Sequence, residues 1–247
     1  MRKLIVVGSS IQPREGKFTY SQTRSSFSAE ERFRQTIFTI NSLRNCFPTS
    51  KIVIVDSSND YLEYWSTIKF FNNVDFIPLK ELSGEAFEIA NSNTNKSVCE
   101  SAILNTYYRQ YKKEILEYDV VVKATGRYFY FDINDDSITN DGIYFKKPLN
   151  FEWNNAWRYN WVDRRTQQNN NRIHQYCTVL YAFGTKHLDK FIDINDAGSH
   201  FLNLESMRHY DIETLSYYLT RPYQDIITEV DWKVSGWDGV SGKFMYY

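Results

Sequence analysis

Short apolar runs punctuate the first half of the chain. They cover residues 3–7, 51–55, 74–79 and 118–123, and they are rich in Val and Ile. Runs of this length, bounded by polar residues, are typical of strands buried on both faces. We therefore predict four buried strands before residue 130.

The stretches between these runs have helical periodicity. Ser28 starts one of them with Glu31 three residues later, the pattern of a capping box, and Pro48 ends it. Residues 61–71 and 98–116 predict two further helices. Strands and helices that alternate in this order favour a mostly parallel sheet with right-handed crossovers, which is an α/β fold.

Beyond residue 130 the pattern is less regular. We expect an acidic turn-rich stretch at 132–141 and a polar aromatic segment at 153–172 that forms a loop or a short helix. A strand at 175–183 and helices at 188–192 and 212–219 follow, and a glycine-rich tail at 232–242 folds back. No repeat or linker divides the chain, so we predict one domain over residues 1–247.

The composition excludes several classes of protein. A chain of 247 residues that is 42% hydrophobic can bury a substantial core, and its net charge of −1 disfavours a nucleic-acid partner. Three scattered cysteines predict no disulfide framework or zinc site and fit a reducing, cytoplasmic location. No apolar run approaches the roughly 20 residues of a transmembrane helix.

Polar side chains follow several of the predicted strands and helix starts. Asp56 and Ser57 end the second strand, Lys96 precedes a helix, and Lys123 and Arg127 bracket a tight turn at the fourth strand's end. Since ligands of open parallel sheets bind at this edge, these residues predict an anion or nucleotide site. One alternative is that Asp56 caps the next turn and that Asn95 or Ser97 caps the helix that starts beside Lys96. The other is that Lys123 forms an ion pair with residues 132–136.

Thr125 and Gly126 form that turn, and the glycine permits a close approach of the backbone to a ligand. Glu213 and Asp211 lie at the start of a predicted helix and are candidates for a general base, with Glu205 as a second choice. The alternative for both is charge complementation of the helix dipole.

Three tryptophans lie in the polar aromatic segment among Asn and Arg residues. Trp153, Trp157 and Trp161 are candidates for stacking on sugar rings, although aromatic side chains more often fill a core. No Walker loop, Gly-x-Gly-x-x-Gly, Gly-x-Ser-x-Gly or His-x-x-x-His motif is present. This disfavours an NTPase, a dinucleotide dehydrogenase, an α/β-hydrolase and a helical zinc site.

Taken in order, these features resemble a group of bacterial and large-virus glycosyltransferases with a GT-A-like fold. The matching elements are the helix and strand that lead to Asp56-Ser57-Ser58, then Asn95-Lys96-Ser97, and above all the run Lys123-Ala124-Thr125-Gly126-Arg127-Tyr128. The resemblance implies a Rossmann-like, mostly parallel sheet flanked by helices, with a nucleotide-sugar-binding half over 1–130. Residues 131–247 would form an irregular, aromatic-rich, acceptor-binding and catalytic half.

The resemblance also implies an activity. An inverting hexosyl- or pentosyltransferase would move a sugar from a nucleotide-sugar donor to a glycan of a surface polysaccharide or glycoprotein. Asp56 would contact the nucleotide, Lys96 the diphosphate, and Glu213 or Asp211 the acceptor hydroxyl. The alternative function is a non-catalytic protein of the same fold that binds a nucleotide or a glycan.

A metal is the point at which this sequence departs from the family. Typical members carry an Asp-x-Asp metal motif near the position of Lys123 to Arg127, and this chain has two cations there. The sequence leaves open whether Mn²⁺ or Mg²⁺ takes part. Our hypothesis is that Lys123 and Arg127 neutralise the leaving diphosphate.

Overall fold

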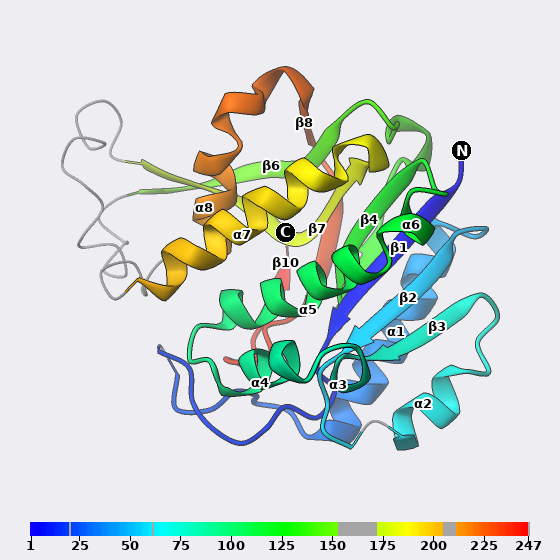
Figure 1. The fold of residues 1–247 in the computed structure, drawn as a ribbon, viewed down its shortest axis with the longest axis vertical. Helices are drawn as coiled ribbons and strands as arrows, with labels where there is room; N and C mark the ends of the chain where they lie inside the picture. The colour runs from blue at the N-terminus through cyan, green and yellow to red at the C-terminus, as the bar shows by residue number, and fades with distance from the viewer. Residues whose placement is uncertain (20, 61, 153–171, 205–210, 247) are drawn as a thin grey trace.

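The core of the molecule is a seven-stranded sheet. The computed structural model describes residues 1–19, 21–60, 62–152, 172–204 and 211–246, and orders the strands β3-β2-β1-β4-β7-β6-β8 (Figure 1). Their bounds are β1 Lys3–Ser9, β2 Lys51–Asp56, β3 Val74–Pro78, β4 Val120–Thr125, β6 Ile143–Glu152, β7 Arg172–Gly184 and β8 Ile227–Val230.

Only β7 reverses direction within this sheet. It pairs antiparallel with both β4 and β6, whereas the other neighbouring strands pair in parallel. The mostly parallel α/β fold predicted from the sequence is therefore confirmed. All seven residues of β1 are buried, which is why that strand reads as one apolar run.

Two layers cover the sheet. Ile5, Val7 and their neighbours pack against helices α1 (Ala29–Cys46) and α2 (Leu62–Ile68) and against a small sheet. Leu4, Val6 and their neighbours pack against α4 (Gly84–Ser92), α5 (Lys96–Gln110) and α7 (Leu188–Asn203) on the other face, which Figure 1 presents to the viewer. Successive residues of β1 thus serve opposite layers, as the two-residue period of a strand requires.

The small sheet has the order β10-β9-β5, with β5 at Tyr128–Phe131, β9 at Lys233–Trp237 and β10 at Phe244–Tyr246. Both of its pairings are antiparallel. The tail therefore folds back as expected. It does so as two strands, which were not predicted because its glycines are typical of loops.

The remaining helices refine the expectations. The predicted helix 98–116 is two helices, α5 (Lys96–Gln110) and α6 (Lys112–Ile115), while α3 (Leu79–Leu82) and α4 (Gly84–Ser92) were not predicted. The capping box of α1 is confirmed, and α8 covers Ile212–Leu219 as expected. The last elements are α7 (Leu188–Asn203) and the 3₁₀ helices η1 (Asp135–Ser137), η4 (Thr185–His187) and η6 (Arg221–Ile226). No helix in the described ranges is long and apolar enough to cross a membrane.

Candidate active site

A pocket lies at the carboxyl ends of β1, β2 and β4. It encloses about 610 Å³ of empty space, part of which is open solvent. Ser9, Ser57 and Thr125 contribute the strand ends, α5 contributes one wall, and the tail contributes Gly239 and Val240. The site predicted at this edge of the sheet therefore coincides with a real cavity.

Cations dominate the lining of this pocket. Among the residues that the structure describes, Arg24, Arg32, Lys96 and Arg127 line it, against one acid, Glu100. Burial, and then repulsion from Arg127, lowers the pKa of Arg32 well below its ordinary value. The negative charge of Asp56 acts on this pKa in the opposite sense but is the smallest of the three causes, so a bound anion would further stabilise the charged guanidinium.

Hydrogen bonds hold two of these arginines in the wall. The Nε of Arg32 donates to the carbonyl of Ser10 at 2.7 Å, and Nη1 of Arg24 donates to the carbonyl of Ala90 at 3.0 Å. Both side chains were missed from the sequence. The sequence does hold a signal for Arg32, because its spacing places it on the same helical face as Gln35, Thr36 and Thr39. In the structure this polar face of α1 is buried.

Arg127 occupies a strained backbone position. Its φ of 90° lies in the left-handed region, which is rare for a residue other than glycine. The hydroxyl of Thr39 accepts hydrogen bonds from the amides of Arg127 at 2.9 Å and Tyr128 at 3.1 Å, which holds the turn. Strain of this kind persists where the surroundings enforce it and often marks a functional site.

The guanidinium of Arg127 is packed but incompletely bonded. A Cβ added to Gly239 would lie 2.9 Å from its Cζ, so any larger residue there would require the guanidinium to shift. Its Nε is buried and has no hydrogen-bond partner among the described residues. By contrast, a Cβ at Gly126 would make ordinary contacts, 3.6 Å from the Ser9 hydroxyl, so space does not demand a glycine there.

Lys96 is the first residue of α5, a helix of 15 residues. The Asn95 side chain caps the helix by accepting from the amide of Ser97 at 2.9 Å. A lysine at a helix N-terminus places a mobile positive charge beside the positive end of the helix dipole. Lys96 also lines the pocket, and its anion-binding role stays a prediction.

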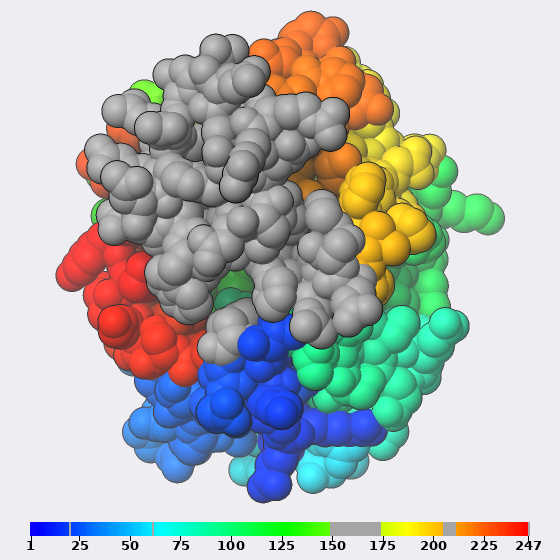
Figure 2. Space-filling view, turned by 90° about the vertical axis from the view of Figure 1, so that its left-hand side faces the viewer, coloured from blue at the N-terminus to red at the C-terminus, as the bar shows by residue number. Residues whose placement is uncertain are grey.

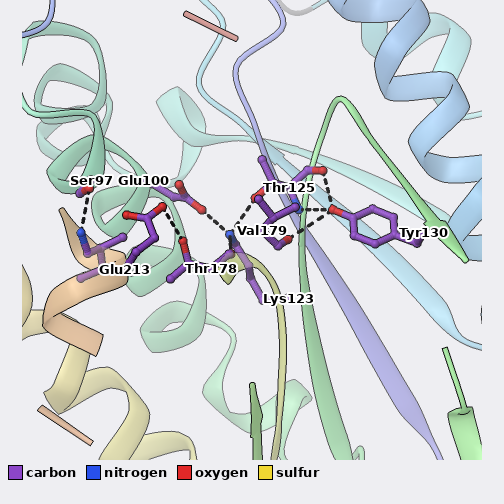
Figure 3. A network of polar contacts seen from close by, with 9 residues as sticks. Ser97, Glu100, Lys123, Thr125, Tyr130, Thr178, Val179 and Glu213 are labelled. Atoms are coloured by element: carbon purple, nitrogen blue, oxygen red, sulfur yellow. Dashed lines mark hydrogen bonds and ion pairs between the residues drawn. The ribbon is translucent and has the colours of Figure 1, made fainter. Parts of the chain in front are cut away.

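Lys123 lies behind the pocket rather than in its lining. The side chain is 1% exposed, and its Nζ donates to Glu100, to the Thr125 hydroxyl at 2.8 Å and to the carbonyl of Thr178 (Figure 3). Its partner is therefore Glu100 and not residues 132–136. The structure separates Lys123 from Arg127: the first organises the wall, and the second faces the cavity.

Glu213 lies at one end of this network. The Thr178 hydroxyl donates to its Oε1 at 3.0 Å, and the amide of Ile212 donates to the Ser97 hydroxyl at 3.1 Å (Figure 3). The start of α8 therefore abuts the start of α5. Burial, and then Asp211, raises the pKa of Glu213 to about 7. A carboxyl group poised near neutral pH suits a general base.

Glu100 responds to the same surroundings in the opposite sense. Burial pushes its pKa upward, but Lys123, followed by Lys96 and Arg127, outweighs burial, so the pKa lies below its ordinary value. Glu100 thus remains a carboxylate that pairs with Lys123. The two half-buried acids differ because, among the described residues, Glu100 has an ion-pair partner in contact and Glu213 has none.

Both oxygens of Asp211 and Asp56 are engaged in the fold. Asp211 caps α8 by accepting from the amide of Thr214 at 2.8 Å, and its second oxygen accepts from Gln175 at 2.8 Å. Asp56 is fully buried and accepts from the amides of Ile11 at 3.0 Å and Ser58 at 2.8 Å. These contacts favour Glu213 over Asp211 as the base, and they place Asp56 beneath the pocket, where it shapes the loop.

The tail closes one side of the pocket. The amide of Ser26 donates to the carbonyl of Gly239 at 2.9 Å, which joins the tail to the segment before α1. Figure 2 shows the red C-terminal residues beside the blue N-terminal ones. Trp153, Trp157, Trp161 and Glu205 lie outside the described residues.

The residues at the end of β4 do not fit the metal that the family resemblance implies. Arg127 lines the pocket there with a positive charge, and the nearby carboxylate of Glu100 is already paired with Lys123, so this strand end offers a divalent cation no excess of negative charge among the described residues. Asp135 is paired with Lys3, and Asp132 with Lys233. Within the part of the chain that the structure describes, no three His, Cys, Asp or Glu side chains are grouped to hold a metal ion.

The sequence matches no protein-family model and no curated protein. Among solved structures, the chain is similar to the galactosyltransferase LgtC in complex with donor and acceptor sugar analogues. The identity is 11% over 94% of this chain and 68% of that one, with a TM-score of 0.38.

Two structures of the glycosyltransferase GlyE from Streptococcus pneumoniae TIGR4 are also similar. One, the apo form, is 10% identical with a TM-score of 0.49, and the other is 11% identical with a TM-score of 0.47. Each match covers 93% of this chain and 45% of the other. Similarity at this level concerns the path of the chain and says nothing about its reaction.

Proposed function

We propose that the protein is a glycosyltransferase that uses a nucleotide-sugar donor and a glycan acceptor. The observation that carries the proposal is the cationic pocket at the strand ends, with Glu213 beside it. Arg127, Arg32 and Lys96 supply charge and donors suited to a diphosphate, and arginine can bind two of its oxygens at once. The pocket is built for an anion, and the neighbouring carboxyl group is tuned for proton transfer.

The reaction follows from this arrangement. Glu213 removes the proton from the acceptor hydroxyl, whose oxygen attacks the anomeric carbon of the donor sugar. The bond between that carbon and the phosphate oxygen breaks, and its electron pair leaves with the nucleoside diphosphate. Arg127 and Lys96 stabilise the charge that develops on this leaving group. A single displacement of this kind inverts the anomeric configuration of a hexosyl or pentosyl residue.

Lys123 enters this proposal as a positioning residue. It holds Glu100 and Thr125 on one side and the Thr178 strand on the other. Thr178 in turn orients Glu213. The single-domain arrangement that we propose, with a donor half in 1–130 and an acceptor half in 131–247, places the joint between the halves at this network.

A thermal-shift screen with UDP, GDP, dTDP and CMP tests the pocket. A nucleotide at 100 times its dissociation constant stabilises the protein by about 2.7 kcal/mol, so the preferred base should emerge as the largest shift. Arg127→Ala should abolish that shift, and Lys233→Ala, which removes an exposed cation far from the pocket lining, should not. A panel that shifts neither protein contradicts the proposal.

Turnover separates catalysis from binding alone. Release of nucleoside diphosphate from the matching nucleotide sugars, measured with a crude glycan pool, should be detectable for the wild type and lost in Glu213→Gln. Nucleotide binding without turnover of any donor would instead support the non-catalytic alternative.

A further inference from the structure

Arg127 carries a buried guanidinium whose charge the described part of the chain leaves uncompensated. The residue is 8% exposed, yet its guanidinium makes neither a hydrogen bond nor an ion pair with the residues that the structure describes. The side chain lines the pocket and packs against Gly239. Taking a charged group out of water without compensation is costly, and a buried polar group left unbonded often marks the site of an ion. The Arg127 side chain is therefore organised for a negatively charged ligand.

Arg32 places a second buried guanidinium beside it. The side chain donates from Nε to the carbonyl of Ser10 at 2.7 Å and from Nη1 to the Ser25 hydroxyl at 3.1 Å. Both acceptors are neutral, and among the described residues Nη2 has no acceptor. Burial, and then the charge of Arg127, lowers the pKa of Arg32, because the two cations repel each other. The pair concentrates positive charge in the part of the pocket that Arg32 and Arg127 line.

The carboxylates near this pair are already engaged. Asp56 accepts hydrogen bonds from the amides of Ile11 at 3.0 Å and Ser58 at 2.8 Å with its two oxygens. Glu100 lines the pocket and forms an ion pair with Lys123. A Mg²⁺ ion that joins a protein to a substrate phosphate is usually held by one or two carboxylates. To hold such an ion, Asp56 would lose these bonds, and Glu100 would have to share its charge with Lys123.

Two further acids belong to the walls of the site. Asp238 begins the turn of the tail that lines the pocket, and its oxygens accept from the amides of Val240 at 3.4 Å and Ser241 at 3.0 Å. Burial, and then Asp211, raises the pKa of Glu213 to about 7, which favours the neutral form of that carboxyl group. None of these four acids offers a divalent cation an uncommitted carboxylate, whereas the two guanidiniums offer an anion uncommitted donors.

We infer, building on the proposed function, that the pocket binds the donor diphosphate as a free anion without a divalent cation, and that Arg32 and Arg127 together take the place of the metal. Each guanidinium can bind two phosphate oxygens through planar, parallel hydrogen bonds. A divalent cation on the diphosphate would cancel part of its negative charge and would add a positive charge beside two guanidiniums. Mg²⁺ and Mn²⁺ therefore oppose binding instead of promoting it.

The rest of the pocket favours the same form of ligand. Lys96 and Arg24 also line it, and the carbonyl of Ala90 accepts from Arg24 at 3.0 Å, which fixes that side chain without neutralising its charge. Among the described residues the lining contains one acid, Glu100, and Lys123 outside the lining matches its charge. A free diphosphate, charged on both phosphoryl groups, balances the excess of cations better than a metal complex of the same diphosphate.

Inorganic pyrophosphate is the probe, because it has the diphosphate without the base or the sugar. Isothermal titration calorimetry measures its affinity in EDTA and then in an excess of Mg²⁺ or of Mn²⁺. The proteins are the wild type, Arg32→Gln, Arg127→Gln and the matched control Arg34→Gln, which removes an arginine of the same helix whose side chain is 70% exposed. Arg127→Gln is the second variant if Arg32→Gln folds poorly, because the Arg127 guanidinium donates no hydrogen bond to the described residues.

We expect the wild type to bind pyrophosphate in EDTA, and to bind it more weakly, by roughly tenfold or more, once either metal is in excess. In EDTA, Arg32→Gln and Arg127→Gln should each lose roughly tenfold or more in affinity, because each removes charged donors from the anion. Arg34→Gln should bind pyrophosphate as the wild type does.

Pyrophosphate that binds only with Mg²⁺ or Mn²⁺, or more tightly with them, would overturn the inference. Wild-type affinity in both pocket variants, an equal loss in Arg34→Gln, or no binding at all would do so too. Turnover of a nucleotide sugar that requires Mn²⁺ would leave the proposed function standing and refute the metal-free site. Metal-independent binding of pyrophosphate without turnover of any donor would contradict the proposed function and leave the metal-free site supported, so the two failures are distinguishable.

Discussion

Replacing Glu213 by glutamine should stabilise the protein at neutral pH while it removes activity. Burial and Asp211 raise the pKa of Glu213 from the ordinary 4.5 to about 7. The native state therefore keeps a proton that the unfolded chain releases, and stability falls as the pH rises from 4.5 to 7. At about 1.4 kcal/mol per pKa unit, the loss is about 3 kcal/mol.

Glutamine has no such loss, since it stays neutral and its oxygen can still accept from the Thr178 hydroxyl. Urea unfolding of the wild type, Glu213→Gln and the exposed control Glu85→Gln at about pH 4.5 and pH 8 measures the difference. Relative to the wild type, Glu213→Gln should gain about 3 kcal/mol between the two pH values. The control should gain nothing.

The same substitution should lower the transfer rate by about 10²–10⁴, because the acceptor hydroxyl loses its base. The wild-type rate should rise with pH along a limb with a pKa of about 7. A variant whose relative stability is the same at both pH values would refute the buried, protonated Glu213. A wild-type transfer rate that rises with a pKa near 4.5 would refute the raised pKa of Glu213.

Three further predictions concern the walls of the site. Lys123→Met should lower the free energy of unfolding in urea by about 3 kcal/mol, and adding Glu100→Gln should restore part of the loss. This is the lower part of the range for breaking a buried pair, because Glu100 is 23% exposed. A loss under about 1 kcal/mol would contradict the importance of the Lys123–Glu100 pair. Arg127→Lys should weaken nucleotide binding measured by calorimetry more than Lys96→Arg, because it loses the planar two-point grip; equal effects would argue against that grip. Thr39→Val should lower the free energy of unfolding by about 1–3 kcal/mol, because the amides of Arg127 and Tyr128 lose their acceptor. It should also reduce nucleotide affinity although Thr39 is absent from the pocket lining, and an unchanged affinity would show that the Arg127 turn does not depend on it.

The sequence predicted the elements whose signals are local. Apolar runs such as 51–55 become strands because both faces of a central parallel strand are buried, so no polar alternation is needed. The capping box at Ser28 and Glu31 likewise depends on residues three positions apart. α3 and α4 were not predicted because they are short. The strands of the tail were not predicted because glycines are typical of loops.

For the candidate site, local patterns indicated which residues lie at the strand ends beside the pocket. Of the seven donor-site residues that the sequence predicted, Ser57, Lys96, Thr125 and Arg127 line the pocket, whereas Asp56, Lys123 and Gly126 do not. That much follows from topology, because the carboxyl ends of parallel strands must meet at one edge.

How those residues divide their roles depends on contacts between segments that are far apart in the sequence. Lys123 and Arg127 are four residues apart, yet the pleat of β4 directs the first toward Glu100 on α5, and the left-handed turn held by Thr39 directs the second to the pocket wall beside Gly239. The pKa of Glu213 depends on burial beside Asp211 and on the meeting of α5 with α8, which are separated by about a hundred residues. Charge and burial arise from contacts across the chain, so no local pattern of residues records them.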